Sequence, residues 1–359
     1  MLSQNYLPVI ELTRGVSLTD EQTLESVHFG AITAVDVKGQ LFAWYGDPNT
    51  VTFLRSSAKP FQALPFIERG GHTAYNLTPR EIALICASHS GTDEHVMVVR
   101  SIQEKAHVQE TNLLCGVHSP IHEPTAKSLR QRNEQPTPNR HNCSGKHSGM
   151  LAFARLENLP IENYIDPNHP IQKLILQTFA EMCGLPLGEV KTGTDGCSAP
   201  NFAVPLYNAA LGFARLCDPE SGNVHPKARC EACRVITHAM TNNPDMIAGP
   251  ERFDTQLMEI THGRILAKGG AEGFQGIGLM PGALGPGSPA IGIAIKIADG
   301  DQKGRAVPAV SLEVLRQMSA LSADDLAALA NFGPVTQITN WRKLVVGELM
   351  PCFKLQSGG

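Results

Sequence analysis

A serine and a lysine near the start of the chain have the spacing of a catalytic pair. Ser56 and Lys59 lie three positions apart in the segment 55–60, RSSAKP. In a helix this spacing places both side chains on one face, whereas Ser57 has the wrong spacing to share that face. Pro60 is tolerated only in a first turn, so a helix should begin near Ser56, where its dipole stabilises developing negative charge. A desolvated lysine binds its proton less tightly, so we predict Ser56 as the nucleophile and Lys59 as its base.

Two further segments strengthen this prediction, because the Ser-x-x-Lys pattern also arises by chance. Residues 86–92, CASHSGT, present Ser88 between two expected helices. Residues 267–273, AKGGAEG, place Lys268 among glycines that let the backbone approach a ligand closely. The alternative interpretation of the two segments is a helix boundary and an ordinary glycine turn.

Two cysteines from separate glycine-rich segments form a second group of reactive side chains. Cys143 lies in NCSGKHSG and Cys197 in GTDGCSAP. Such thiols bind divalent cations, zinc first, and His147 follows Cys143 by four positions, so the residue types favour two cysteines and one histidine as ligands. Lys146 can ligate only when neutral, which makes it an unusual candidate. The alternative is a pair of buried cysteines in tight turns.

The expected elements change in character along the chain. Residues 27–37 and 41–45 are rich in β-branched and aromatic residues around a short glycine-containing turn, which is typical of a hairpin. Residues 78–81, TPRE, form a capping box with proline at the first helical position, and Asp93 is the expected N-cap of the next helix. The hydrophobic pattern predicts helices at residues 93–107, 168–182, 201–216, 228–240 and 310–330, and strands at residues 290–298 and 345–355.

This order predicts an α+β fold in which both ends of the chain build one antiparallel sheet. Residues 1–60 and 264–359 would form the sheet, and residues 61–263 a mainly helical region inserted between its halves. We expect one domain over residues 1–359, because no low-complexity linker and no internal repeat divides the sequence.

The composition is typical of a globular protein without nucleic acid or membrane partners. The 359 residues are 42% hydrophobic and 18% charged, and the net charge of −4 comes without a basic run. No window reaches the roughly 18 apolar residues of a membrane span, and residues 1–5 lack a basic region, so we expect a soluble, cytoplasmic protein without a signal peptide. The nine cysteines are odd in number and scattered, which favours reduced thiols.

In combination, these segments resemble the rhizobial-type L-asparaginases, also called class 3 asparaginases or the asparaginase II family. The resemblance covers most of the chain. It rests on ELTRG at 11–15, RSSAKPFQ at 55–62, ASHSG at 87–91, CG at 115–116, HNCSGKH at 141–147, DPNHP at 166–170, DGCSAP at 195–200 and AKGGAEG at 267–273. It implies a fold like that of serine β-lactamases and serine-dependent glutaminases, and a homodimer that hydrolyses L-asparagine to L-aspartate and ammonia.

The resemblance also implies catalytic roles for individual residues. Ser56 with Lys59 and Ser88 with Lys268 would form two serine–lysine pairs. In these pairs Ser56 is the nucleophile and Lys59 its base, while Ser88 and Lys268 relay protons. A substrate with an α-carboxylate and an α-ammonium group needs charged anchors, and Arg55, beside the nucleophile, is a candidate for one of them.

The metal site of the family maps onto Cys143, Lys146 and Cys197, with a water as the fourth ligand. The resemblance therefore implies the unusual lysine ligand, against the preference of the residue types for His147. His147 and Asp195 would lie next to the metal. Zinc would shape the pocket or hold substrate rather than polarise the amide.

Two other functions remain as alternatives. An enzyme of the same fold could act on glutamine, a β-lactam or a peptide. The KGG in place of KTG argues against penicillin recognition, but glutamine differs from asparagine by one methylene, which the sequence does not resolve. A catalytically silent, metal-stabilised binding protein is the second alternative, and the presence of both serine–lysine pairs argues against it.

Overall fold

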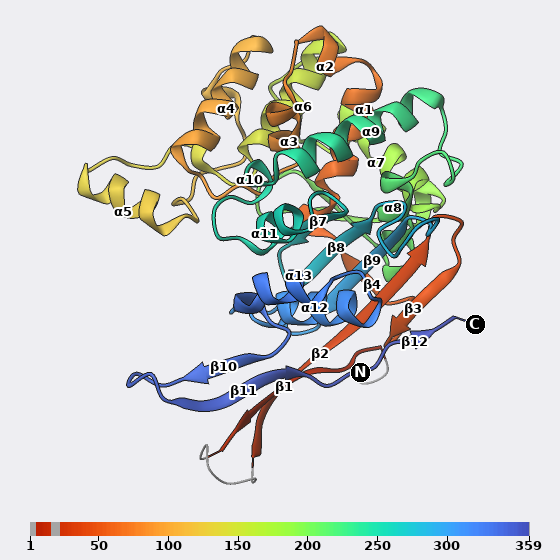
Figure 1. The fold of residues 1–359 in the computed structure, drawn as a ribbon. Coiled ribbons are helices and arrows are strands. Elements are labelled where there is room, and N and C mark those ends of the chain that lie inside the picture. The colour runs from red at the N-terminus through yellow and green to blue at the C-terminus, as the bar shows by residue number, and fades with distance from the viewer. Residues whose placement is uncertain (1–4, 16–21, 359) are drawn as a thin grey trace.

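Strands from both ends of the chain meet in one antiparallel sheet, as predicted (Figure 1). The computed structural model describes residues 5–15 and 22–358, so the expectation about a signal peptide falls largely outside the described residues. Seven strands follow one another in the order β10-β11-β1-β2-β9-β8-β7, while β3 pairs with β2 and β12 pairs with β3. Their bounds are β1 Leu7–Arg14, β2 Thr23–Asp36, β3 Leu41–Tyr45, β7 Ile265–Gly270, β8 Phe274–Leu279, β9 Ile291–Ile297, β10 Thr336–Thr339, β11 Val345–Pro351 and β12 Gln356–Ser357.

The middle of the chain forms the helical part, which lies above the sheet in Figure 1. It also holds a small antiparallel sheet of β4 (Val51–Phe53), β6 (Pro200–Pro205) and β5 (Lys191–Thr194), in that order. The helices are α1 Lys59–Glu68, α2 Gly71–Ala74, α3 Pro79–Ile85, α4 Asp93–Lys105, α5 Glu123–Gln131, α6 Ser144–Leu156, α7 Pro170–Cys183, α8 Leu206–Cys217, α9 Lys227–Asn242, α10 Pro244–Ile247 and α11 Phe253–Ile260, followed after the sheet strands by α12 Ala306–Gln317 and α13 Ala323–Ala328. None of the helices among the described residues is long and apolar enough to cross a membrane.

The core lies where α8 and α12 contact the central strand β9. All but one of the residues of β9 are buried, and because side chains alternate between the two faces of a strand, both faces of the sheet are covered there. Gly292 makes the contact with α8 possible, because a Cβ at that position would lie 1.8 Å from the carbonyl oxygen of Ala210 and 2.5 Å from the backbone nitrogen of Ala214.

The helix predicted over residues 201–216 is wrong in its first part. Residues 200–205 form β6, which pairs with β4 and β5, and α8 begins only at Leu206. Pro205 separates the two elements, because its ring fixes φ at −55° and it has no N–H to continue a helical hydrogen-bond pattern.

The helix predicted over residues 310–330 is interrupted. Residues 306–317 form α12, and α13 begins at Ala323 because the Ser322 hydroxyl accepts a hydrogen bond from the Asp325 backbone N–H. The N-cap of α4 is Thr92 rather than Asp93. The capping box at Thr78 is confirmed, as are the hairpin of β2 and β3 and the strand β9.

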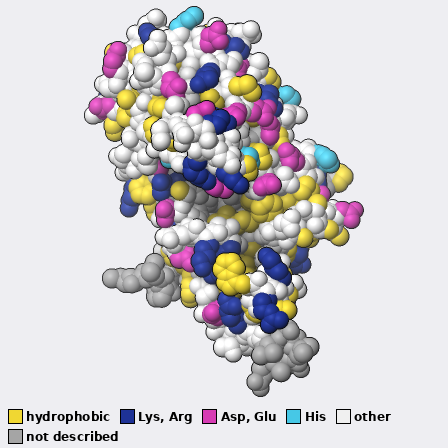
Figure 2. All heavy atoms as spheres, turned by 90° about the vertical axis from the view of Figure 1, so that its left-hand side faces the viewer, with side chains coloured by type: hydrophobic (Ala, Val, Ile, Leu, Met, Phe, Trp, Pro, Cys, Tyr) yellow, Lys and Arg dark blue, Asp and Glu magenta, His cyan; other side chains and the backbone are white. Residues whose placement is uncertain are grey.

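The hairpin of β10 and β11 exposes a tryptophan near its turn. Figure 2 is viewed from the side on which α5 and this hairpin extend, and it shows Lys and Arg side chains gathered around hydrophobic ones on the lower part of the molecule. Trp341 is fully exposed, and Leu344 is about half exposed. Arg342 and Lys343 lie between them in the sequence, so this turn carries both apolar and basic side chains.

Candidate active site

Three side chains from distant parts of the chain meet at one hydroxyl group. Lys59 begins α1, Ser88 follows α3, and Lys268 lies in β7. Lys59 Nζ lies 2.9 Å from Ser88 Oγ, and Lys268 Nζ lies 3.1 Å from the same oxygen. Both lysines are 1% exposed, so the two amines are removed from water. The structure thus brings together three of the four predicted catalytic residues.

Burial lowers the affinity of Lys268 for its proton. Burial lowers the pKa of Lys268 to about 7, and the positive charges of Lys59 and Arg252 lower it as well, whereas the negative charge of Asp254 opposes the shift. Lys59 donates further hydrogen bonds to the carbonyl oxygens of Ala87 at 2.5 Å and Asn142 at 3.4 Å. Since both amines contact Ser88 Oγ, a proton can pass between Lys59 and Lys268 across this hydroxyl.

Ser56 precedes Lys59 by three residues but makes no hydrogen bond to this group. Residues 55–58 form a 3₁₀ turn and α1 begins at Lys59, so Ser56 is half-buried just before the helix. Among the described residues, neither the Ser56 hydroxyl nor its backbone N–H makes a hydrogen bond, and Lys59 turns to Ser88 instead. Arg55 has a φ of 51°, a left-handed conformation that is uncommon for residues other than glycine and is enriched at functional sites.

Arg55 is engaged by Asp195 and is not a free cation. Its Nε donates to Asp195 Oδ1 at 2.8 Å, and its Nη1 lies 4.0 Å from Glu272 Oε1. Although burial alone would raise it, the pKa of Asp195 lies below its usual range because the charges of Lys146 and Arg55 stabilise the carboxylate. Arg55 could therefore anchor a substrate carboxylate only in competition with Asp195.

Two residues at this site were not found from the sequence. Ser57 was set aside for its spacing, yet its buried hydroxyl donates to the carbonyl oxygen of Lys268 at 2.5 Å. Asp254 accepts a hydrogen bond from the Gly269 backbone N–H at 2.6 Å. No local pattern marks either residue, because their partners lie far away in the chain or on another element.

The predicted metal ligands lie together in the helical part. Lys146 Nζ donates to Cys197 Sγ at 2.9 Å, and both cysteines are buried. The Cys197 thiol, together with the positive charges of Lys59 and Lys146, holds the pKa of Cys143 well below its usual range. Although burial alone would lower it, the pKa of Lys146 is raised by the sulfur atoms of Cys197 and Cys143. The pKa of Cys197, the sulfur that Lys146 contacts, is raised by Cys143 and by burial, so the pKa values of the two thiols are shifted in opposite directions.

One ring nitrogen of His147 forms a hydrogen bond and the other does not. Its Nδ1 lies 2.6 Å from the hydroxyl oxygen of Tyr164, while its Nε2 is buried and has no hydrogen-bond partner among the described residues. Within the same residues, no group of three or more His, Cys, Asp or Glu side chains is placed to hold a metal ion. The set of two cysteines and His147 that the residue types favoured is therefore not formed.

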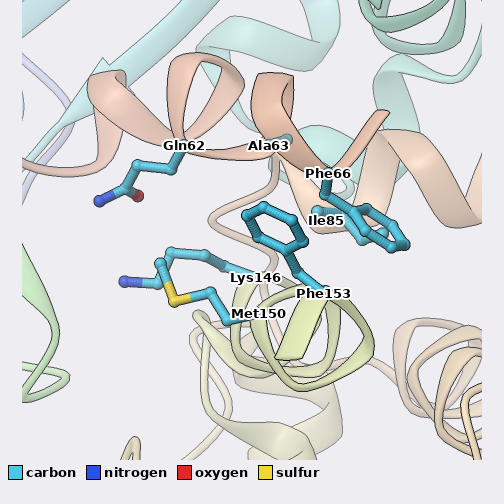
Figure 3. A pocket seen from close by; sticks show the side chains of 8 residues that line it. Gln62, Ala63, Phe66, Ile85, Lys146, Met150 and Phe153 are labelled. Atoms are coloured by element: carbon cyan, nitrogen blue, oxygen red, sulfur yellow. The ribbon is translucent and has the colours of Figure 1, made fainter. Parts of the chain in front are cut away.

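The stem of Lys146 lies against an apolar wall (Figure 3). Lys146, Met150 and Phe153 of α6 face Phe66 and Gln62 of α1 across a small cavity. In Figure 3 the amine of Lys146 and the amide of Gln62 point to one end of this cavity, and the aromatic rings fill the other. The wall leaves the amine of Lys146 only the polar end, where Cys197 lies.

Comparisons with known proteins give one family and several distant structures. The sequence profile of the L-asparaginase II family matches residues 16–351. No curated protein sequence matches the chain. A covalent complex of the Bacillus subtilis glutaminase YbgJ with 5-oxo-L-norleucine is 14% identical, with a TM-score of 0.40 over 82% of this chain and 89% of that one. A Bacillus glutaminase in 4.3 M NaCl is 14% identical, with a TM-score of 0.39 over 81% of this chain and 91% of that one. These two structures are too distant to carry an argument about function.

Proposed function

Because this chain belongs to the L-asparaginase II family, we propose that it hydrolyses L-asparagine to L-aspartate and ammonia at the group formed by Ser56, Lys59, Ser88 and Lys268. The family assignment supports an amidohydrolase. The observation that carries the proposal is the Ser88 hydroxyl between two buried lysine amines, at 2.9 and 3.1 Å. Two such amines on one hydroxyl provide a route along which a proton can move to and from a reacting group.

The route explains how Lys59 becomes a base. Ser88 passes its proton to neutral Lys268 and takes one from Lys59, which leaves Lys59 neutral and Lys268 charged. Neutral Lys59 then accepts the proton of Ser56 while Ser56 Oγ forms a bond to the side-chain amide carbon and the carbonyl electrons move onto oxygen. The backbone N–H of Ser56, which has no partner among the described residues, is available to the resulting oxyanion.

The second half of the reaction uses the same groups in reverse. The oxyanion collapses and the C–N bond breaks, and the leaving nitrogen takes its proton from Lys59 to depart as ammonia. Water then attacks the aspartyl ester, gives one proton to Lys59, and Ser56 Oγ leaves with a proton from the same lysine. Ser88 then passes its proton back to Lys59 and takes one from Lys268, so Lys59 is charged and Lys268 neutral again. The new carboxylic acid gives its proton to the released ammonia, and L-aspartate and the starting enzyme result.

Ammonia release from L-asparagine and L-glutamine tests this function. We expect wild type and Ser128→Ala, a control in α5, to release ammonia faster from asparagine, and Ser56→Ala to lose about 10³-fold or more in kcat. Turnover that survives in Ser56→Ala but not in Ser88→Ala would move the attack to Ser88. Faster release from glutamine would contradict asparagine as the substrate. No release from either amide would contradict the proposed amidohydrolase activity.

Zinc is proposed as a resident metal held by Cys143, Lys146 and Cys197. The donor set fits, because two buried thiols with a lowered pKa at one of them suit a borderline cation, and an unpartnered ring nitrogen of His147 lies in the same sequence turn. Lys146 would have to lose its proton on binding. When bound, the metal would shape the pocket, and no proton or electron pair of the reaction passes through it.

A homodimer and a cytoplasmic location belong to the same proposal. The resemblance to the family supports the homodimer, and the amino-acid composition supports the cytoplasmic location. Residues of one chain build the group of Lys59, Ser88 and Lys268.

A further inference from the structure

Asp254 is a buried carboxylate that the proposed reaction does not use. It lies in the first turn of α11 and is 8% exposed. Its Oδ2 accepts from the Gly269 N–H at 2.6 Å, and its Oδ1 accepts from Gln275 Nε2 at 2.9 Å. No lysine, arginine or histidine of the described chain forms a salt bridge with it. Burying a carboxylate without a direct ion pair is costly unless hydrogen bonds compensate, and both oxygens of Asp254 accept one.

The Gly269 N–H belongs to the same peptide group as the carbonyl of Lys268. That carbonyl accepts a hydrogen bond from Ser57 Oγ at 2.5 Å, so the peptide group is held from α11 at one end and from the turn before α1 at the other. β7 is the last strand of the sheet, and N–H groups on its free edge have no neighbouring strand. At Gly269, Asp254 thus accepts the backbone hydrogen bond that a neighbouring strand would otherwise accept.

We propose that Asp254 is a positioning residue for Lys268, which fixes the peptide group that carries this lysine and supplies a buried negative charge beside its amine. The proposal rests on the proposed function, in which Lys268 takes up and returns a proton. It assigns a role to the carboxylate that neither the sequence motifs nor the serine–lysine geometry includes.

The charges around Lys268 show what this carboxylate does. Burial and the positive charges of Lys59 and Arg252 lower the pKa of Lys268, whereas Asp254 and the Cys143 sulfur raise it, with a balance at about 7. The buried Cys86 is the other titratable group close to this amine. Without Asp254 the pKa falls further, so Lys268 stays neutral near pH 7 and accepts the proton from Ser88 less readily.

A pH titration of lysine side chains by NMR tests the proposal without depending on turnover. In protein with ¹³Cε-labelled lysine, Lys268→Met identifies the signal of Lys268 by its absence. We expect Asp254→Asn to lower the pKa of Lys268 by about one pH unit or more. Glu259→Gln, which removes an exposed charge from the same helix, should leave it unchanged. An equal pKa in wild type and Asp254→Asn would overturn the charge role of Asp254.

The pH dependence of kcat and kcat/KM separates the two roles proposed for Asp254, positioning the peptide group and supplying a negative charge. Since the required form is neutral Lys268, Asp254→Asn should move the acid limb of kcat/KM to lower pH and reduce kcat, whereas Ser57→Ala should reduce kcat without moving the limb. If Asp254→Asn does not fold, Asp254→Ser keeps an acceptor oxygen without the charge. Amide hydrolysis with an unshifted Lys268 would overturn this inference and leave the function intact. A shifted Lys268 without any hydrolysis would overturn the function alone.

Discussion

The burial of Lys268 lowers the free energy of unfolding at a residue that the proposed reaction uses. An ordinary lysine has a pKa of 10.5, and burial lowers that of Lys268 to about 7. The unfolded chain therefore binds more protons than the folded protein between these values, so stability rises with pH across this window and the full cost is present below about pH 7. The native structure bears this cost at the residue to which we assign the proton relay.

Lys268→Met should therefore stabilise the protein while it abolishes activity. We expect the free energy of unfolding at pH 7 to rise on the order of 1–3 kcal/mol, and the gain to vanish toward pH 10. Urea unfolding at both pH values measures it. Lys303→Met, at an exposed lysine, serves as the control and should change stability by less than about 0.5 kcal/mol. If Lys268→Met lowers the free energy of unfolding, burial of this lysine does not destabilise the folded protein.

The metal proposal also belongs to single residues. Cys197→Ala and Lys146→Met should each lose zinc after dialysis, because each removes one of three protein ligands. Cys233→Ala, at a buried cysteine of α9, should keep it. Metal analysis of the purified proteins is the readout. If His147→Gln loses zinc and Lys146→Met keeps it, the third protein ligand is His147, as the residue types favoured, and not Lys146.

At the scale of elements, the contact between α8 and β9 depends on one missing side chain. Gly292→Ala would place a Cβ 1.8 Å from the Ala210 carbonyl oxygen, so helix and strand must separate. We expect a loss of about 1–3 kcal/mol or more in the free energy of unfolding. Gly188→Ala, where a Cβ would meet nothing within 4 Å, should be nearly neutral. Equal stability of the two variants would contradict the packing described for α8.

Elements were predicted well where the signal was local and poorly where it was not. The capping box at Thr78 was found because both partners lie within four residues. The hydrophobic run at residues 201–216 looked continuous, but its first residues pair with β4 and β5, whose positions only the folded chain determines. Pro205, which separates strand from helix, was the available signal and was outweighed by the periodicity around it.

At the scale of the whole molecule, the proposed homodimer should be visible in solution. Sedimentation equilibrium should give about twice the chain mass of 38.7 kDa. Trp341 is fully exposed near the turn of the β10–β11 hairpin, where Leu344 and Val345 are exposed as well; exposed apolar side chains that cluster mark association surfaces, so Trp341→Ser should weaken the dimer. Met97→Ser, at an exposed residue of α4, is the control. A monomeric wild type at micromolar concentration would overturn the dimer.

The sequence by itself, with the family resemblance that it carries, determined the organisation of sheet ends around a helical insertion and named the residues that gather at Ser88. These features follow from local periodicity, caps and short motifs. Only the tertiary structure decided that Lys59 turns to Ser88 rather than to Ser56, and that Ser57 and Asp254 hold Lys268. Such contacts depend on packing between segments as far apart as the 180 residues that separate Ser88 from Lys268, and no local pattern encodes the distance or burial that sets their chemistry.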